Sequence, residues 1–200
     1  FGASTQSGSV DYRTPSLDLG GATVSATYTY DPNAGAGAPS AGGVSSTAQS
    51  GQAVTAKISM AGLTLGGGYE EISTSLQSGD DNSVATGYVL YSNGPLKIGY
   101  QEMYENAEHA SGTVGRDNEG DGYGISFSQD NYSFSYAEVE ETNKAVAAVT
   151  TANSTVEMSA MQATYTMGAA TLGVSMYETD NPEGTTGKYE ETEISVSFAF

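Results

Sequence analysis

The sequence contains no cysteine and no tryptophan, and only 6 of its 200 residues are lysine or arginine. Without cysteine there is no disulfide framework, no thiolate metal site and no cysteine nucleophile. The few basic residues stand against 24 aspartates and glutamates, which gives a formal net charge of −18. A nucleic-acid-binding role is excluded, because neutralising phosphates requires a basic face. No apolar run approaches the length of a transmembrane helix.

Two further classes have little support in the residues that are present. A disordered acidic chain would lack the regularly spaced tyrosine, phenylalanine, valine and isoleucine of this sequence. An enzyme would need a recognisable set of reactive groups, yet His109 is the only histidine and no serine lies in a G-x-S-x-G frame. We therefore expect no catalytic residues.

The C-terminal residues show the clearest local pattern. Apolar residues occupy every second position at Ile194, Val196, Phe198 and Phe200, with Ser195, Ser197 and Ala199 between them. This period of two predicts a β-strand with one apolar and one polar face. No stretch has a convincing helical period with caps.

The same alternation recurs along the whole chain and predicts an all-β protein with a single domain over residues 1–200. We expect about eleven antiparallel strands. They cover residues 8–17, 21–31, 51–61, 63–74, 82–92, 95–105, 121–129, 131–141, 156–167, 170–179 and 189–200. The connections alternate between tight turns near 18–20, 62, 93–94, 130 and 168–169 and long polar loops near 32–50, 75–81, 106–120, 142–155 and 180–188. This is typical of an up-and-down meander.

The two strand faces differ in a way that favours a membrane environment. The polar face consists mostly of threonine, serine and glycine, and the apolar face repeatedly ends in tyrosine, as at Tyr28, Tyr69 and Tyr100. Aromatic girdles, strands of about ten residues and alternating loop lengths characterise transmembrane β-barrels. We therefore predict an antiparallel up-and-down transmembrane barrel. The alternative is a soluble all-β protein with tyrosines in ordinary cross-strand pairs.

Two segments resemble those of known bacterial barrels. The alternating C-terminus, Ile194, Val196, Phe198 and the final Phe200, resembles the assembly signal of outer-membrane proteins. Ser9, Val10, Tyr12, Thr14 and Pro15 match the N-S-[IV]-x-Y-x-[ST]-P strand of the Gram-negative general porins, with Gly8 where that family has asparagine. The acidic, Gly- and Thr-rich composition is similar to that of alphaproteobacterial porins.

The resemblance implies a barrel of sixteen strands, in which the matching motif falls at about the sixth strand. Counting eleven strands from there reaches the end of the chain. An odd number of strands also places the two termini on opposite sides, whereas single-chain bacterial barrels have an even number. The chain is therefore expected to be the C-terminal part of a longer porin. The alternative is a complete barrel of ten or twelve strands.

If the apolar faces point to lipid, the opposite positions line the pore. The expected pore-lining residues are Asp11, Arg13, Thr23, Thr27, Lys57, Lys97, Gln101, Glu191 and Glu193. Hydrophilic walls without tight binding groups suit passive diffusion. The family resemblance implies a basic wall, for which Arg13, Lys57 and Lys97 are candidates, each with the alternative of an ordinary ion-paired wall residue. The acidic excess predicts a weak cation preference.

Oxygen-rich loops offer a candidate calcium site. Asp117, Glu119 and Asp121 lie in an expected loop and resemble the start of a calcium loop. The twelfth position is Ser128 rather than glutamate, so an EF-hand is rejected, and solvated acidic loops are the alternative. Met158, Met161, Met167 and Met176 are expected to face lipid or an interface rather than a metal.

Together these features predict an outer-membrane porin for small hydrophilic solutes and ions, with no obligate cofactor. The resemblance implies a homotrimer in contact with lipid and lipopolysaccharide and inserted by the barrel-assembly machinery. Ala22, Ala26 and Ala56 are candidates for the protomer interface, with lipid contact as the alternative. The rival function is a surface-exposed structural or adhesive β protein with acidic calcium-binding loops. A barrel that serves mainly as a phage receptor or anchor would share the fold.

Overall fold

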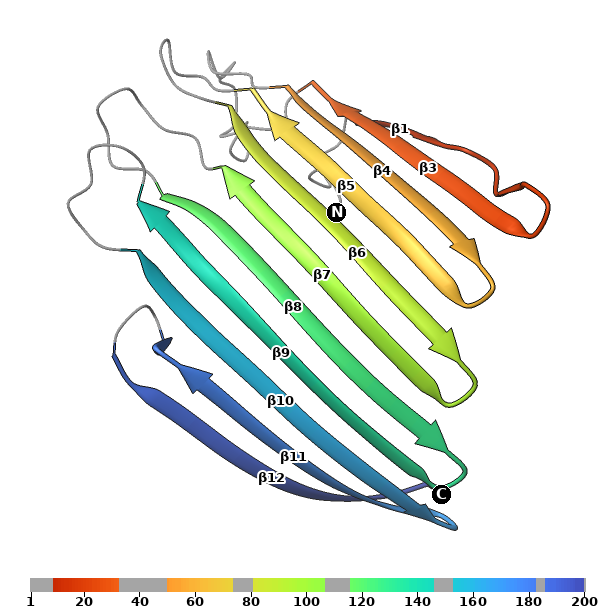
Figure 1. Cartoon of the computed structure of the whole chain (residues 1–200), viewed down its shortest axis with the longest axis vertical. Helices are drawn as coiled ribbons and strands as arrows, with labels where there is room; N and C mark the ends of the chain where they lie inside the picture. The colour runs from red at the N-terminus through yellow and green to blue at the C-terminus, as the bar shows by residue number, and fades with distance from the viewer. Residues whose placement is uncertain are drawn as a thin grey trace, which may run out of the picture.

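The chain forms one antiparallel sheet in which successive strands are neighbours (Figure 1). The computed structural model describes residues 9–32, 50–73, 81–106, 116–145, 153–182 and 186–199. The sheet order is β1-β3-β4-β5-β6-β7-β8-β9-β10-β11-β12, and β2 pairs beside this path with β3. The path of eleven strands agrees with the expected meander.

The strands are short at the N-terminal edge and long in the second half. The first six are β1 (Val10–Arg13), β2 (Leu17–Asp18), β3 (Ala22–Asp31), β4 (Gly51–Met60), β5 (Leu63–Ile72) and β6 (Asn82–Asn93). The others are β7 (Leu96–Asn106), β8 (Arg116–Gln129), β9 (Tyr132–Ala145), β10 (Ser154–Met167), β11 (Ala170–Asp180) and β12 (Lys188–Phe198).

The tight turns all lie at one edge of the sheet, which we call the short-turn end; the opposite edge is the long-connection end (Figure 1). Each tight turn contains a residue with positive φ, as predicted from its Gly, Asn and Asp content. These residues are Gly20, Gly21, Ala61, Gly62, Gly94, Asp130 and Gly168. At Gly62, φ is +84° and an added Cβ would lie 2.3 Å from the carbonyl oxygen of Ser92, so only glycine fits.

The first expected strand, 8–17, is interrupted. β1 ends at Arg13 and only Leu17–Asp18 resumes pairing with β3, because Pro15 has no N–H for the ladder. The side chain of Thr14 replaces part of the lost pairing: its Oγ1 accepts a hydrogen bond from the Ala26 N–H at 2.9 Å.

Three strands are longer than predicted. β8, β9 and β10 have 14 residues each, so the expected loops 106–120 and 142–155 begin or end within strand. Strand β8 begins at Arg116 rather than 121, and β9 continues to Ala145 rather than 141. The prediction ended too early because charged residues replace the apolar ones in these extensions, so the period-two signal disappears.

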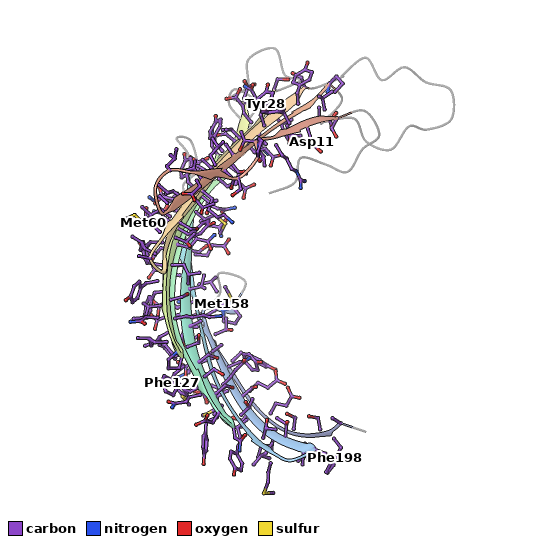
Figure 2. All side chains as sticks on the ribbon, turned by 90° about the vertical axis from the view of Figure 1, so that its right-hand side faces the viewer. Asp11, Tyr28, Met60, Phe127, Met158 and Phe198 are labelled. Atoms are coloured by element: carbon purple, nitrogen blue, oxygen red, sulfur yellow. The ribbon has the colours of Figure 1, made fainter. Side chains whose placement is uncertain are left out.

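The sheet is strongly curved, and its two faces differ (Figure 2). Met60 and Phe127 point from the convex face, and Asp11 and Met158 lie on the concave side. The strand registers extend this assignment to the other residues because paired residues share a face. The expectation for Met158 was wrong: it lies on the concave face with Gln162 and Thr164, whereas Met161 lies on the convex face.

The sheet is a single layer without a hydrophobic core. Among the described residues only Asp31, Gly51 and Ala53 are buried, with Asp31 at 1% and Ala53 at 7% exposure. Most of the large apolar side chains are instead exposed on the convex face. A soluble sandwich would bury this face against a second sheet, and the described residues contain no second sheet.

Candidate functional site

A continuous apolar surface covers the convex face at the short-turn end. We call it the convex band, and it starts at the tight turns and extends about six residues along each strand, or about 20 Å. Its members include Ile58, Leu65, Ile98, Ile125, Phe134, Leu172 and Val196, which are between 40% and 59% exposed. Exposed apolar surfaces of this extent mark an interface with lipid or protein.

Tyrosine–carboxylate pairs lie at the boundary of the convex band that is nearer the long-connection end. The hydroxyl of Tyr69 donates to Glu71 at 2.7 Å, and that of Tyr100 donates to Glu102 at 2.8 Å. Tyr136 and Tyr123 both donate to Glu138, at 2.5 and 2.8 Å. Each carboxylate lies two residues beyond Tyr69, Tyr100 or Tyr136 toward the long-connection end, and Glu138 is also the direct cross-strand partner of Tyr123.

One cross-strand row on the convex face changes from small to acidic residues. This mixed row consists of Ala26, Ala56, Gly67, Gly87, Glu102, Asp121, Glu140, Glu157, Asp180 and Lys188, each paired with the next. Ala56 lies four residues from Met60 at the short-turn end of β4, whereas Glu140 lies eight residues from Tyr132 at the start of β9. The row therefore leaves the convex band as it crosses the sheet, a stagger typical of a tilted barrel wall.

The three candidate calcium ligands do not lie in a loop. Asp117, Glu119 and Asp121 alternate along one face of β8, and Glu119 forms an ion pair with Lys144 of β9. Within the described ranges there is no group of three or more acidic or histidine side chains placed to hold a metal ion. The loop position was wrong because strand pairing with β7 and β9 continues through this acidic segment.

The expected pore-lining residues share the concave face. The registers place all nine on the side opposite the convex band: Asp11, Arg13, Thr23, Thr27, Lys57, Lys97, Gln101, Glu191 and Glu193. Cross-strand hydroxyl pairs lie between some of the charged positions. Thr27 is 2.5 Å from Thr55, and Ser133 is 2.6 Å from Thr164, oxygen to oxygen. Hydroxyl groups are polar but uncharged, so these positions make the surface hydrophilic without adding charge.

The charges of the concave face are predominantly negative. Its carboxylates come from Asp11, Asp18, Asp31, Glu70, Glu105, Glu141, Glu191 and Glu193. The candidate basic residues Arg13, Lys57 and Lys97 lie on β1, β4 and β7, so they form no contiguous wall. No ion pair joins any of the three to a carboxylate within the described part of the chain.

The concave face also contains a groove that sequence reasoning missed. It has a volume of about 650 Å³ and lies across β6–β9. Gly99, Gly120, Gly122 and Gly124 form its floor, and the registers Gly99↔Gly124 and Gln101↔Gly122 place them side by side. Tyr88, Leu90, Met103, Ala137 and Val139 surround this floor, with Lys97, Ser126 and Ser135 at the short-turn end.

The position of Tyr88 depends on a glycine in the neighbouring strand. Gly66 of β5 pairs with Tyr88, and a Cβ added at Gly66 would lie only 2.4 Å from the ring carbon Cζ of Tyr88. The ring therefore extends over Gly66, in the direction away from β7. Glycines at every second position, as at 66 and 68 and at 120, 122 and 124, were the sequence signal that could have indicated this surface.

Three of the four expected assembly-signal residues lie within the described part of the chain. Ile194, Val196 and Phe198 lie on the convex face of β12, opposite Val174, Leu172 and Ala170. Phe200 lies outside the described residues. The described part of the chain contains no helix with the length and apolar content needed to span a membrane.

Comparison with known proteins identifies the fold. The chain is similar to a solved porin structure refined at 1.8 Å resolution, with a TM-score of 0.63 and 15% sequence identity. The similarity covers 95% of this chain and 60% of the porin chain, so this chain spans well under two thirds of that protein's length. No protein-family model and no curated protein matches the sequence. The all-β, antiparallel, up-and-down fold of the barrel type is confirmed.

Proposed function

We propose that this chain forms part of the wall of an outer-membrane porin, a water-filled channel for the passive diffusion of small hydrophilic solutes and ions. The observation that carries the proposal is the convex band on a single-layer sheet of porin fold. In lipid, strand N–H and C=O groups are all satisfied only when the sheet closes into a barrel. We propose that this sheet is the C-terminal part of such a sixteen-stranded barrel.

The polarity of the two faces supports this assignment. Hydrocarbon would cover the convex band, and the tyrosine–carboxylate pairs would lie where the apolar layer meets polar headgroups. The concave face, with its hydroxyl pairs and separated charges, would then line the channel. A soluble adhesive protein would leave the convex band in water, so this rival has less support.

The excess of carboxylates on the concave face supports a weak cation preference. A homotrimer is proposed by analogy with the general porins, and Ala22, Ala26 and Ala56 provide a smooth convex surface on β3 and β4 that suits either a neighbouring protomer or lipid.

Planar-bilayer recording of the full-length protein tests the channel function. We expect stepwise conductance increases in potassium chloride and a reversal potential in a salt gradient that indicates modest cation selectivity. A folded protein that inserts in the bilayer without any conductance step would contradict the proposal. Anion selectivity would contradict only the cation preference.

A further inference from the structure

The groove on the concave face differs from the rest of that surface. A wall that serves only diffusion would be uniformly hydrophilic, and the concave side of β3 and β4 is, with Thr27, Thr55 and Lys57. Across β6–β9, the same face instead presents Leu90, Met103 and Val139, which are 37%, 43% and 38% exposed. An apolar surface inside a polar channel is unexplained by diffusion alone.

We propose that this groove is a binding subsite for planar amphipathic anions, with aromatic carboxylates as the chemical class. The proposal rests on the channel function proposed above, since the groove then faces the lumen. Its volume of about 650 Å³ lies within the usual range for small-molecule sites, which are mainly apolar with a few placed polar groups.

The floor of the groove suits a flat body. Gly99 and Gly124 are paired across β7 and β8, and the nearest side-chain atoms lie 3.6 and 3.7 Å from where their Cβ atoms would be. Without side chains, their backbone allows close approach of a planar group. The thioether of Met103 borders this floor and makes favourable contacts with aromatic rings. Tyr88 lines the groove on β6, with its ring over Gly66.

The short-turn end of the groove suits a carboxylate. Lys97 is exposed there, and the register places Ser126 and then Ser135 beside it in one row. Of the groove-lining residues that face inward, all of them described, Lys97 is the one with a charge. A ligand whose carboxylate pairs with Lys97 would place its aromatic ring over the glycine floor. The same carboxylate would accept hydrogen bonds from the hydroxyls of Ser126 and Ser135.

The experiment uses the full-length protein in planar bilayers with three probes: benzoate, its neutral analogue benzamide, and acetate. We expect benzoate to block the open-channel current at a concentration about tenfold lower than either of the others, because only benzoate has both the ring and the charge. Equal block by benzoate and acetate would overturn the role of the groove floor. Equal block by benzoate and benzamide would overturn the role of Lys97.

Substitutions of Lys97 and of the floor glycines test whether benzoate blocks the channel by binding in the groove. Lys97→Met should reduce benzoate affinity to that of benzamide, whereas Lys57→Met, on the same face of β4, should leave it within about twofold. Gly99→Leu and Gly124→Leu should weaken benzoate block about tenfold by filling the floor; their added Cβ atoms meet only ordinary contacts, 3.4 Å or longer. Gly87→Leu, on the convex face with no atom within 4 Å of the added Cβ, is the matched control.

Saturation-transfer NMR with benzoate in detergent micelles separates this proposal from the channel function. Loss of all conductance with retained benzoate binding would contradict only the channel, and conductance with no benzoate binding would contradict only the subsite. Benzoate binding that survives both Lys97→Met and Gly124→Leu would overturn the assignment to the groove.

Discussion

The mixed row joins two regions with opposite chemistry, although hydrogen bonds connect them without a break. On β3–β6 its members are Ala26, Ala56, Gly67 and Gly87; on β7–β11 they are Glu102, Asp121, Glu140, Glu157 and Asp180. The small residues lie within the convex band, and the carboxylates lie at its boundary or beyond it. The residue type in this row therefore depends on how far the residue lies from the short-turn end of its strand, and not on its membership of the row.

The physical reason is the stagger of the hairpins. Glu102 lies six residues from Leu96, and Asp180 lies ten residues from Ala170, so successive members of the row move toward the long-connection end. In a tilted barrel this displacement carries the row out of the apolar layer. The difference between the two regions thus indicates how far each residue would lie from the centre of the proposed membrane.

The largest expected effect comes from placing one cation on each side of this boundary in the same strand. Ile125→Arg and Asp121→Arg are both on the convex face of β8, four residues apart. We expect Ile125→Arg to lower the free energy of unfolding in lipid vesicles by about 2–4 kcal/mol and Asp121→Arg to change it by about 0–1 kcal/mol. Denaturant titration measures both, and equal losses would contradict a membrane boundary between these positions.

A second, smaller effect is expected at the turns that fix the stagger. Gly62→Ala should cost about 1–3 kcal/mol, because Gly62 has positive φ and its Cβ would clash with the carbonyl of Ser92. Gly94→Ala is the control: φ is also positive, but no atom lies within 4 Å of the added Cβ, so a cost of about 1 kcal/mol is expected. Unfolding in vesicles measures the difference, and indistinguishable variants would show that the contact with Ser92 is unimportant.

The smallest effect is expected within the acidic part of the row. Glu140 is paired with Asp121 on one side and Glu157 on the other, and like charges directly opposite are destabilising. Glu140→Gln should raise the free energy of unfolding by about 0.2–1 kcal/mol at low salt, and the gain should vanish near 1 M salt. Glu71→Gln, which loses the charge that accepts the Tyr69 hydroxyl, should give no gain. A gain for Glu140→Gln that persists at high salt would exclude repulsion as its cause.

Sequence reasoning succeeded where polarity alternates strictly. The pattern from Ile194 to Phe198 gave a strand that β12 confirms, and the glycine and asparagine turns gave the hairpins. It failed where the environment changes along a strand. In β8, the carboxylates of Asp117 and Glu119 alternate with Asn118 and Gly120, so no apolar period remains to indicate a strand.

The groove was missed for a related reason. The sequence interpretation assigned apolar residues to one face throughout, but Val139 and Met158 lie on the concave face while Glu138 and Glu157 lie on the convex face. Only the registers with neighbouring strands determine such an inversion, because an isolated strand with both faces mixed has no preferred side. The candidate residue Lys97 was identified from the sequence. The glycine floor was not, because it combines residues of β7 and β8 that only the strand register brings together.

The lack of a buried hydrophobic core in the described part of the sheet affects how substitutions can change this protein. In most globular proteins a substitution that reshapes a binding surface also disturbs the packing that maintains the fold. In the channel proposed for this chain, residues on the convex face would determine stability in the membrane, and residues on the concave face would determine the passage of solutes. In such a channel, single substitutions on the concave face would change permeability with little effect on folding.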